Sequence, residues 1–250
     1  AGRNPVVNVP LGAAAGRPTL LDRPQIAGAF DALYNGDDAM SRAYRQSQAA
    51  HRDVMASMNK DDRQSLEREM QAASNGAPLP NGFPDNAARL ATLMRNDPRV
   101  QLAFMDLGGW DTHANQGAAS GQLANRLGPL GQGLSALATR LGPVWNDTVV
   151  VVMSEFGRTV RQNGNGGTDH GHGNVMWLLG GRVAGGKVHG RWPGLDERAL
   201  HEGRDLAVTT DFRQVLADLS ERHLRLPDAR LAEVFPQFAA ASSGLRLMRA

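Results

Sequence analysis

Three short polar clusters carry the side chains in this sequence that are best suited to chemistry. They cover residues 108–113, 154–159 and 167–174 and contain Asp111, His113, Glu155, Arg158, Asp169, His170 and His172. Neutral imidazole together with carboxylate suits zinc, manganese or iron, whereas carboxylate alone favours magnesium or calcium. The glycines of the third cluster allow the tight turns that aim several side chains inward. The clusters therefore predict one site for a divalent metal, with zinc, manganese, magnesium or calcium as the ion.

Each cluster taken alone has a simpler interpretation. Asp111 can cap a helix after a strand-ending turn, and Glu155 and Arg158 can form an ordinary ion pair at a helix start. His170 and His172 can lie on an exposed loop. Three such clusters beside consecutive hydrophobic runs are better explained by one shared site than by three independent accidents. A shared site predicts that the donor atoms of its ligands lie within about 5 Å of one another.

The hydrophobic runs beside the clusters predict the strands that position them. Residues 100–107 form a short apolar run that ends at the first cluster, and residues 148–153 end at the second. The latter run is β-branched on both faces, which is typical of a central parallel strand covered by helices on each side. Residues 175–179 form a third strand-like run directly after the third cluster. We therefore expect three strands of one sheet.

A long helix is expected between the first two of these strands. Leucines recur every three or four residues from Leu123 to Leu141. This spacing places them on one helical face, which we expect to pack against the sheet, and Gly142 and Pro143 should end the helix. Strand, helix and strand in alternation predict an α/β fold. In open α/β sheets ligands bind at the carboxyl ends of strands, where Asp111, His113 and Glu155 are expected.

The N-terminal third of the chain reads as mainly helical. Residues 24–73 predict two or three helices, residues 75–86 a linker, and residues 87–95 a further helix that ends before Pro98. The only strand expected before them is Pro5–Val9. We interpret residues 1–250 as one domain with a helical insertion at residues 24–75.

Composition excludes several classes of protein. The chain has 250 residues and no cysteine, so disulfides, thiol catalysis and Cys-ligated metals are excluded. The formal net charge is only +2, and the basic residues are spread among Asp and Glu without an aromatic-interleaved patch, so we expect no nucleic-acid partner. No apolar run reaches the roughly 18 residues of a transmembrane helix.

The remaining histidines are weaker candidates. His51, His201 and His223 lie in helical or polar contexts and are interpreted as structural or solvated. His189 lies in a glycine-rich stretch, residues 185–193, that can fold over the site, so a contact with substrate or metal stays open for it.

The three clusters, together with Gly190-Arg191-Trp192-Pro193, resemble the DUF1501 family of bacterial exported proteins. The resemblance is strongest over residues 100–193 and continues through residues 209–213 and 234–236. That family is placed with the alkaline phosphatase and sulfatase superfamily. The resemblance implies a three-layer α/β/α sandwich with a mostly parallel sheet, and export by a twin-arginine signal to the periplasm or outside the cell.

The same resemblance assigns roles to the candidate residues. Asp111 and His113 resemble a metal-ligand pair of the superfamily, and His170 resembles its late histidine ligand. Asp169 and His172 are further candidate ligands by residue type. Glu155 stands where relatives carry an Asp-His pair and is a candidate ligand or general base. Arg158 is a candidate anion clamp because its guanidinium can bind phosphate or sulfate through two hydrogen bonds. Phe156 stands where relatives carry a ligating histidine. We find no counterpart of the superfamily's early Asp ligand and nucleophile before residue 100, so we expect the chain to hold the C-terminal part of the family pattern.

Two functions follow as expectations. The first is an exported, metal-dependent hydrolase of small phosphate or sulfate esters, in which metals polarise the ester. The second is a non-catalytic exported protein that keeps the scaffold to bind an envelope component or partner.

Overall fold

A computed structural model describes residues 24–57, 79–238 and 245–249. The strand expected at Pro5–Val9, and the parts of the predicted helical insertion and linker within residues 58–78, lie outside the described residues. The chain divides into two compact units. The first unit comprises residues 1–109 and 126–141, and the second unit comprises residues 110–125 and 142–250.

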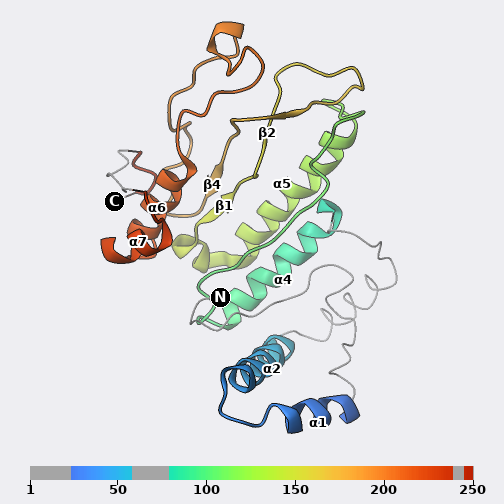
Figure 1. Ribbon diagram of the computed structural model, residues 1–250, viewed down its shortest axis with the longest axis vertical. Helices are drawn as coiled ribbons and strands as arrows, with labels where there is room; N and C mark the ends of the chain where they lie inside the picture. Colours follow the sequence, from blue (N-terminus) through green and yellow to red (C-terminus); the bar gives the residue numbers. More distant parts are fainter. Residues whose placement is uncertain (1–23, 58–78, 239–244, 250) are drawn as a thin grey trace. The chain divides into compact units, whose positions relative to one another are not determined.

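The first unit is helical in its described part (Figure 1). Helix α1 spans Pro24–Leu33 and α2 spans Ala39–Ser57. Asp38 precedes α2 and accepts hydrogen bonds from the backbone N–H groups of Met40 and Ser41 and from the Ser41 hydroxyl. The Ser41 hydroxyl bond contributes most to lowering the pKa of Asp38 to about 2. Asp38 therefore acts as a charged cap that fixes where α2 begins.

Helices α4 and α5 form the packed part of the first unit. The short 3₁₀ helix η3 (Pro80–Gly82) leads into α4, Phe83–Asn96, which begins earlier than the predicted helix at residue 87. Helix α5 spans Gln122–Leu141, and its buried residues include Leu130, Leu134, Leu137 and Leu141. The leucine periodicity therefore predicted this helix correctly. A Cβ atom on Gly133 would lie 2.1 Å from the Phe83 ring, so α5 packs closely against α4.

The described residues of the second unit contain two small sheets. Strand β1 (Val150–Val152) pairs antiparallel with β4 (Trp177–Leu179), with Val151 opposite Leu178. Strand β2 (Gly157–Arg158) pairs antiparallel with β3 (His170–Gly171). Only β2 and β3 are consecutive in the chain and form a hairpin, whereas β1 and β4 are separated by the residues that contain β2 and β3. The β2–β3 hairpin lies within the connection between β1 and β4 (Figure 1).

Helix α6 covers one face of the β1–β4 pair. It spans Phe212–Arg222 and is capped by Asp211, whose side chain accepts a hydrogen bond from the N–H of Arg213. Val215 and Leu219 of α6 form a core cluster with Leu247, and partly buried apolar residues of the sheet and the C-terminal segment pack against it: Val149, Val151, Met176, Leu178, Leu245 and Met248. This cluster is the hydrophobic core described for the second unit.

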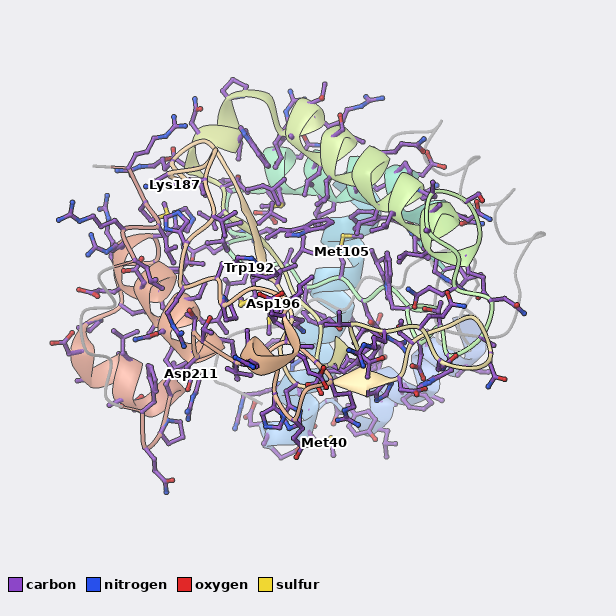
Figure 2. All side chains as sticks on the ribbon, turned by 90° about the horizontal axis from the view of Figure 1, so that it is seen from above. Met40, Met105, Lys187, Trp192, Asp196 and Asp211 are labelled. Atoms are coloured by element: carbon purple, nitrogen blue, oxygen red, sulfur yellow. The ribbon has the colours of Figure 1, made fainter. Side chains whose placement is uncertain are left out.

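The remaining elements of the second unit are short. The 3₁₀ helix η4 (Gly142–Asp147) follows α5, and Gly142 has a φ of +55°, so α5 ends where the sequence predicted. The 3₁₀ helix η5 spans Glu197–Ala199, and α7 spans Asp228–Val234. Figure 2 labels Trp192 and Asp196 on the irregular segment between β4 and α6. In the described residues no helix is long and apolar enough to cross a bilayer.

The predicted three-layer α/β/α sandwich with a mostly parallel sheet is wrong. The described residues contain only short antiparallel strand pairs and no large parallel sheet. A parallel pair needs a crossover connection, usually a helix, whereas the chain between β1 and β4 forms the β2–β3 hairpin. The β-branched run at residues 148–153 correctly predicted a strand, but the strand that pairs with it is antiparallel rather than parallel.

The strand predicted at residues 100–107 is absent. The structure assigns no strand there, and Leu102 and Phe104 are 76% and 91% exposed. An apolar run becomes a strand only when another strand satisfies its backbone hydrogen bonds. None of the described strands pairs with this segment.

Candidate metal centre

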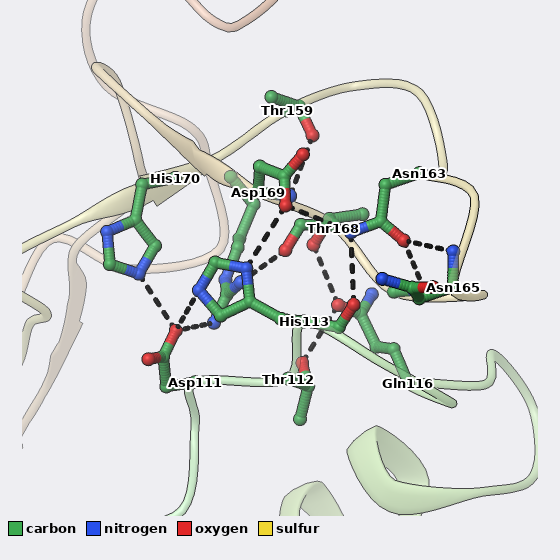
Figure 3. Close-up of polar contacts among 12 residues, drawn as sticks. Asp111, Thr112, His113, Gln116, Thr159, Asn163, Asn165, Thr168, Asp169 and His170 are labelled. Atoms are coloured by element: carbon green, nitrogen blue, oxygen red, sulfur yellow. Dashed lines mark hydrogen bonds and ion pairs between the residues drawn. The ribbon is translucent and has the colours of Figure 1, made fainter.

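Three of the predicted ligands converge in the second unit. Asp111 Oδ1 lies 2.9 Å from His113 Nε2 and 2.8 Å from His170 Nε2 (Figure 3). One donor atom from each of the three residues lies within 4.8 Å of the others, which meets the spacing expected of a shared site. Their side chains are 45–57% exposed, so the group faces solvent.

The geometry fits a small divalent ion after a modest adjustment. Four-coordinate zinc with ligand bonds of about 2.0–2.1 Å holds its donor atoms roughly 3.3 Å apart. Asp111 Oδ1 lies closer than that to both imidazole nitrogens. Asp111 Oδ1 would therefore have to move only about 0.5 Å away from each imidazole nitrogen to admit the ion.

His113 is held between two carboxylates. Its Nε2 faces Asp111 and its Nδ1 lies 3.1 Å from Asp169 Oδ1. A neutral imidazole has one N–H, so it can donate to only one of the two carboxylates and must direct a lone pair at the other. Either a second proton or a metal cation removes this mismatch. An Nδ1–H donated to Asp169 leaves Nε2 free to bind a metal beside Asp111, an arrangement typical of metal-binding histidines.

Asp169 has its own support. Asn163 Nδ2 donates to Asp169 Oδ1 at 2.9 Å and to the His113 carbonyl at 3.0 Å (Figure 3). The hydrogen bonds from Asn163 and His113 contribute most to lowering the pKa of Asp169. Asp169 lies outside the converging group of described residues, so the structure places it as the partner that orients His113.

Two neighbours orient His170. It lies in β3 directly opposite Arg158 of β2. The Phe156 ring stacks on the His170 imidazole, with centroids 4.5 Å apart and planes inclined by 12°. Phe156 therefore fixes the plane of the imidazole and keeps its Nε2 directed at Asp111.

Arg158 is bound to the site by its guanidinium group. Its Nη2 donates to Asp111 Oδ1 at 2.7 Å and to the Trp110 carbonyl at 2.8 Å, and its Nη1 donates to the Thr168 carbonyl. The hydrogen bond from His170 contributes most to lowering the pKa of Asp111, with charge from His113, His170 and Arg158 acting in the same direction. Asp111 is therefore held ionised, as a metal ligand must be.

A network of backbone and side-chain bonds joins the first and third clusters. Gln116 Oε1 accepts hydrogen bonds from the hydroxyls of Thr112 and Thr168 at 2.9 and 2.7 Å (Figure 3). Thr112, which lies between Asp111 and His113 in the chain, is buried. At Gly167 a Cβ atom would lie 2.2 Å from the His113 carbonyl carbon. Only glycine therefore lets the loop approach the backbone that carries His113.

The other predicted site residues lie elsewhere. Glu155 is exposed, and its carboxylate makes no hydrogen bond or ion pair with another described residue. His172 is not in the Asp111 group but converges with His201 and Asp205 in a second group. His189 directs its ring nitrogens at the carbonyls of Leu245 and Ala184, so it joins neither group.

The sequence did not predict the group of His172, His201 and Asp205, because His201 was interpreted as structural and Asp205 is part of no recognisable motif. A signal was nevertheless present. Glu202 and Gly203 have φ values of +52° and +65°, and the Arg204 N–H bonds to the His201 carbonyl at 3.0 Å. Positive φ at both central residues is the pattern of a type I′ turn, here over residues 201–204, for which an X-Gly pair is a sequence cue. This turn places Asp205 beside His201.

Comparison with known proteins identifies a family without assigning an activity. Residues 19–235 match the family described as "Protein of unknown function (DUF1501)". No curated protein matches the chain, and no solved structure matches it.

Proposed function

The chain belongs to the DUF1501 family, and from that premise we propose that it is a metal-dependent hydrolase of small phosphate or sulfate esters. Asp111, His113 and His170 would hold the divalent metal. Catalytic zinc sites typically have three protein ligands and leave a further position for water or substrate. A solvent-facing group of two imidazoles and one carboxylate has that character.

The position of His113 between two carboxylates is the observation that carries the proposal. In a cluster without a metal, the ring must either direct a lone pair at one carboxylate or carry a second proton. With a metal in place, Asp169 accepts the Nδ1 proton and Nε2 becomes a ligand. Asp169 would thus be a positioning residue for His113 rather than a ligand.

The chemistry follows from the ion and its surroundings. A bound divalent metal polarises an ester oxygen or lowers the pKa of bound water. Arg158 lies beside the ligands and its bonds to the Trp110 and Thr168 carbonyls keep it there. If the Asp111 carboxylate bound a metal, the Nη2 group of Arg158 would no longer donate to it and could bind an anionic oxygen. The resemblance that places the family with the alkaline phosphatase and sulfatase superfamily supports phosphate or sulfate as that anion. The imidazole and carboxylate donors suit zinc or manganese as the ion.

The proposal is tested by metal content and turnover in parallel. The protein is equilibrated with Zn²⁺ or Mn²⁺, dialysed, analysed for bound metal, and assayed with p-nitrophenyl phosphate, bis(p-nitrophenyl) phosphate and p-nitrophenyl sulfate. The double variant Asp111→Ala/His170→Ala should lose metal and hydrolysis together. His223→Ala, which removes a histidine outside both groups, is the matched control. Equal metal content in the double variant and the parent would overturn the proposal.

A second function is favoured by one observation. The Arg158 guanidinium is already bonded to Asp111 and to two backbone carbonyls, which leaves it little capacity for a substrate anion. This arrangement suits a protein that binds a partner through the same scaffold and does not turn over an ester. Bound metal without hydrolysis of any of the three esters, including by the full-length gene product, would favour this second function.

We also propose, from the sequence resemblance, that the protein acts in the periplasm or outside the cell. Fractionation of cells that express the full-length gene tests this. Recovery only with the cytoplasmic fraction would contradict it.

A further inference from the structure

A second cluster of metal-binding side chains lies next to the candidate centre in sequence but shares no residue with it. His172, His201 and Asp205 each offer a donor atom within 4.8 Å of the others. His172 Nδ1 lies 3.0 Å from Asp205 Oδ2, and the centroids of the two imidazole rings are 3.8 Å apart. We propose that these three residues form a second, separate site for a divalent transition metal.

The carboxylate of this cluster is the most buried charged group described in the second unit. The Asp205 side chain is 0% exposed. Burial raises its pKa, but the backbone N–H of His172, the Arg204 guanidinium and the His172 ring outweigh burial, so the pKa of Asp205 is lowered overall. A buried, ionised carboxylate beside two imidazoles is a strong electrostatic attraction for a cation.

His201 supplies the second observation. Its Nδ1 is buried and has no hydrogen-bond partner. A buried polar nitrogen without a partner costs free energy, and such atoms are rare unless an ion, a water or a function explains them. If the cluster served only to pin the 201–205 turn to β3, a hydrogen bond to both histidines would be expected. An imidazole nitrogen that lacks a protein partner is instead available to an ion.

The backbone brings the cluster together at some cost. The turn that joins His201 to Asp205 places the non-glycine residue Glu202 at a φ of +52°, a region that side-chain-bearing residues rarely adopt. Gly171 and Gly173 let the 205–207 segment approach, because a Cβ atom on Gly171 would lie 2.7 Å from Asp205 Cβ and one on Gly173 would lie 2.5 Å from the Leu206 carbonyl oxygen. Strain of this kind is found most often at functional sites.

The donor set defines the class of ion. Two imidazoles and one carboxylate favour zinc, cobalt or nickel over magnesium and calcium, which prefer oxygen ligands alone. The donors are at most 4.8 Å apart and a tetrahedral ion needs roughly 3.3 Å. The His172 side chain is about half exposed, so it can rotate to close that difference.

Cobalt titration of the untagged chain tests the second site independently of the first. Co²⁺ bound to nitrogen and oxygen ligands is followed by its visible absorption and by equilibrium dialysis. The parent should bind about two ions per chain, and His201→Ala and His113→Ala about one each, as expected for separate ligand sets. The combined variant should bind none. His223→Ala, outside both groups, should bind as the parent does.

Each outcome decides one site without the other. One ion in the parent, lost in His113→Ala and kept in His201→Ala, overturns the second site and leaves the proposed function standing. One ion lost only in His201→Ala overturns the first site and supports the second. His201→Gln, which keeps a polar side chain, guards against misfolding: circular dichroism should match the parent while the second ion is lost. A folded His201→Gln that still binds two ions overturns the proposal.

Discussion

The Phe156 ring lies flat against the His170 imidazole, with centroids 4.5 Å apart. The guanidinium carbon of Arg158 lies 4.9 Å from the centre of the same phenyl ring. Phe156 therefore holds the His170 imidazole from one side and the Arg158 guanidinium lies over the same ring.

Removing the Phe156 ring should therefore weaken metal binding without removing a ligand. An aromatic stack contributes about 0.5–1.5 kcal/mol, so Phe156→Ala should raise the dissociation constant of the Asp111 group roughly two- to tenfold. Phe156→Tyr, which keeps the stack, is the matched control. Both are measured by cobalt titration in the His201→Ala background, where only the first site remains. Unchanged affinity in Phe156→Ala would show that the stack does not position His170.

The Asp169 carboxylate should act through His113. Partners that orient a ligating histidine typically contribute 10- to 100-fold to metal affinity, so Asp169→Asn should lose about that factor. Asp196→Asn is the matched control, because Asp196 makes no side-chain capping bond at η5. X-ray absorption at the cobalt edge should count the same number of imidazoles in Asp169→Asn as in the parent. Loss of one oxygen ligand instead would make Asp169 a ligand.

Local sequence signals predicted the helices better than the sheet. The leucine spacing of α5 and the proline after α4 act within a few residues, so pattern alone was sufficient to predict them. The direction of β1 relative to β4 depends on the path of residues 153–176, which form a hairpin rather than a crossover helix. Hydrophobicity at residues 148–153 contains no information about that path.

The candidate site residues were likewise predicted only in part. Asp111, His113 and His170 were predicted by residue type, and they converge although the described residues contain no parallel sheet. The assignment of His172 depended on which side of the hairpin receives the 201–205 turn. That docking is set by the close approach permitted at Gly171 and Gly173, which no motif revealed.

Asp205 should give the protein part of its acid sensitivity. Its pKa is lowered from the ordinary value of 3.8, so its contribution to stability is complete above that value and is lost as the pH falls below it. Asp205→Asn should cost roughly 1–3 kcal/mol at pH 7, because the buried side chain loses its charged hydrogen bonds. Urea unfolding from pH 6 to pH 2.5, with metal removed, should show the two curves converging at the acid end. Parallel curves would show that Asp205 is not the titrating group.

Two glycines in the β2–β3 hairpin allow the effect of close backbone approach to be tested separately from the effect of loop conformation. Alanine at Gly167 would place its Cβ 2.2 Å from the His113 carbonyl carbon, whereas alanine at Gly164 would meet no atom within 4 Å. Overpacking of this kind costs about 1–3 kcal/mol, so Gly167→Ala should lower the unfolding free energy by that amount. Because the displaced backbone carries His113, cobalt affinity of the first site should fall at least tenfold as well. Gly164→Ala should leave both quantities within about 0.5 kcal/mol of the parent. Equal effects from the two substitutions would mean that the loop does not hold His113 in place.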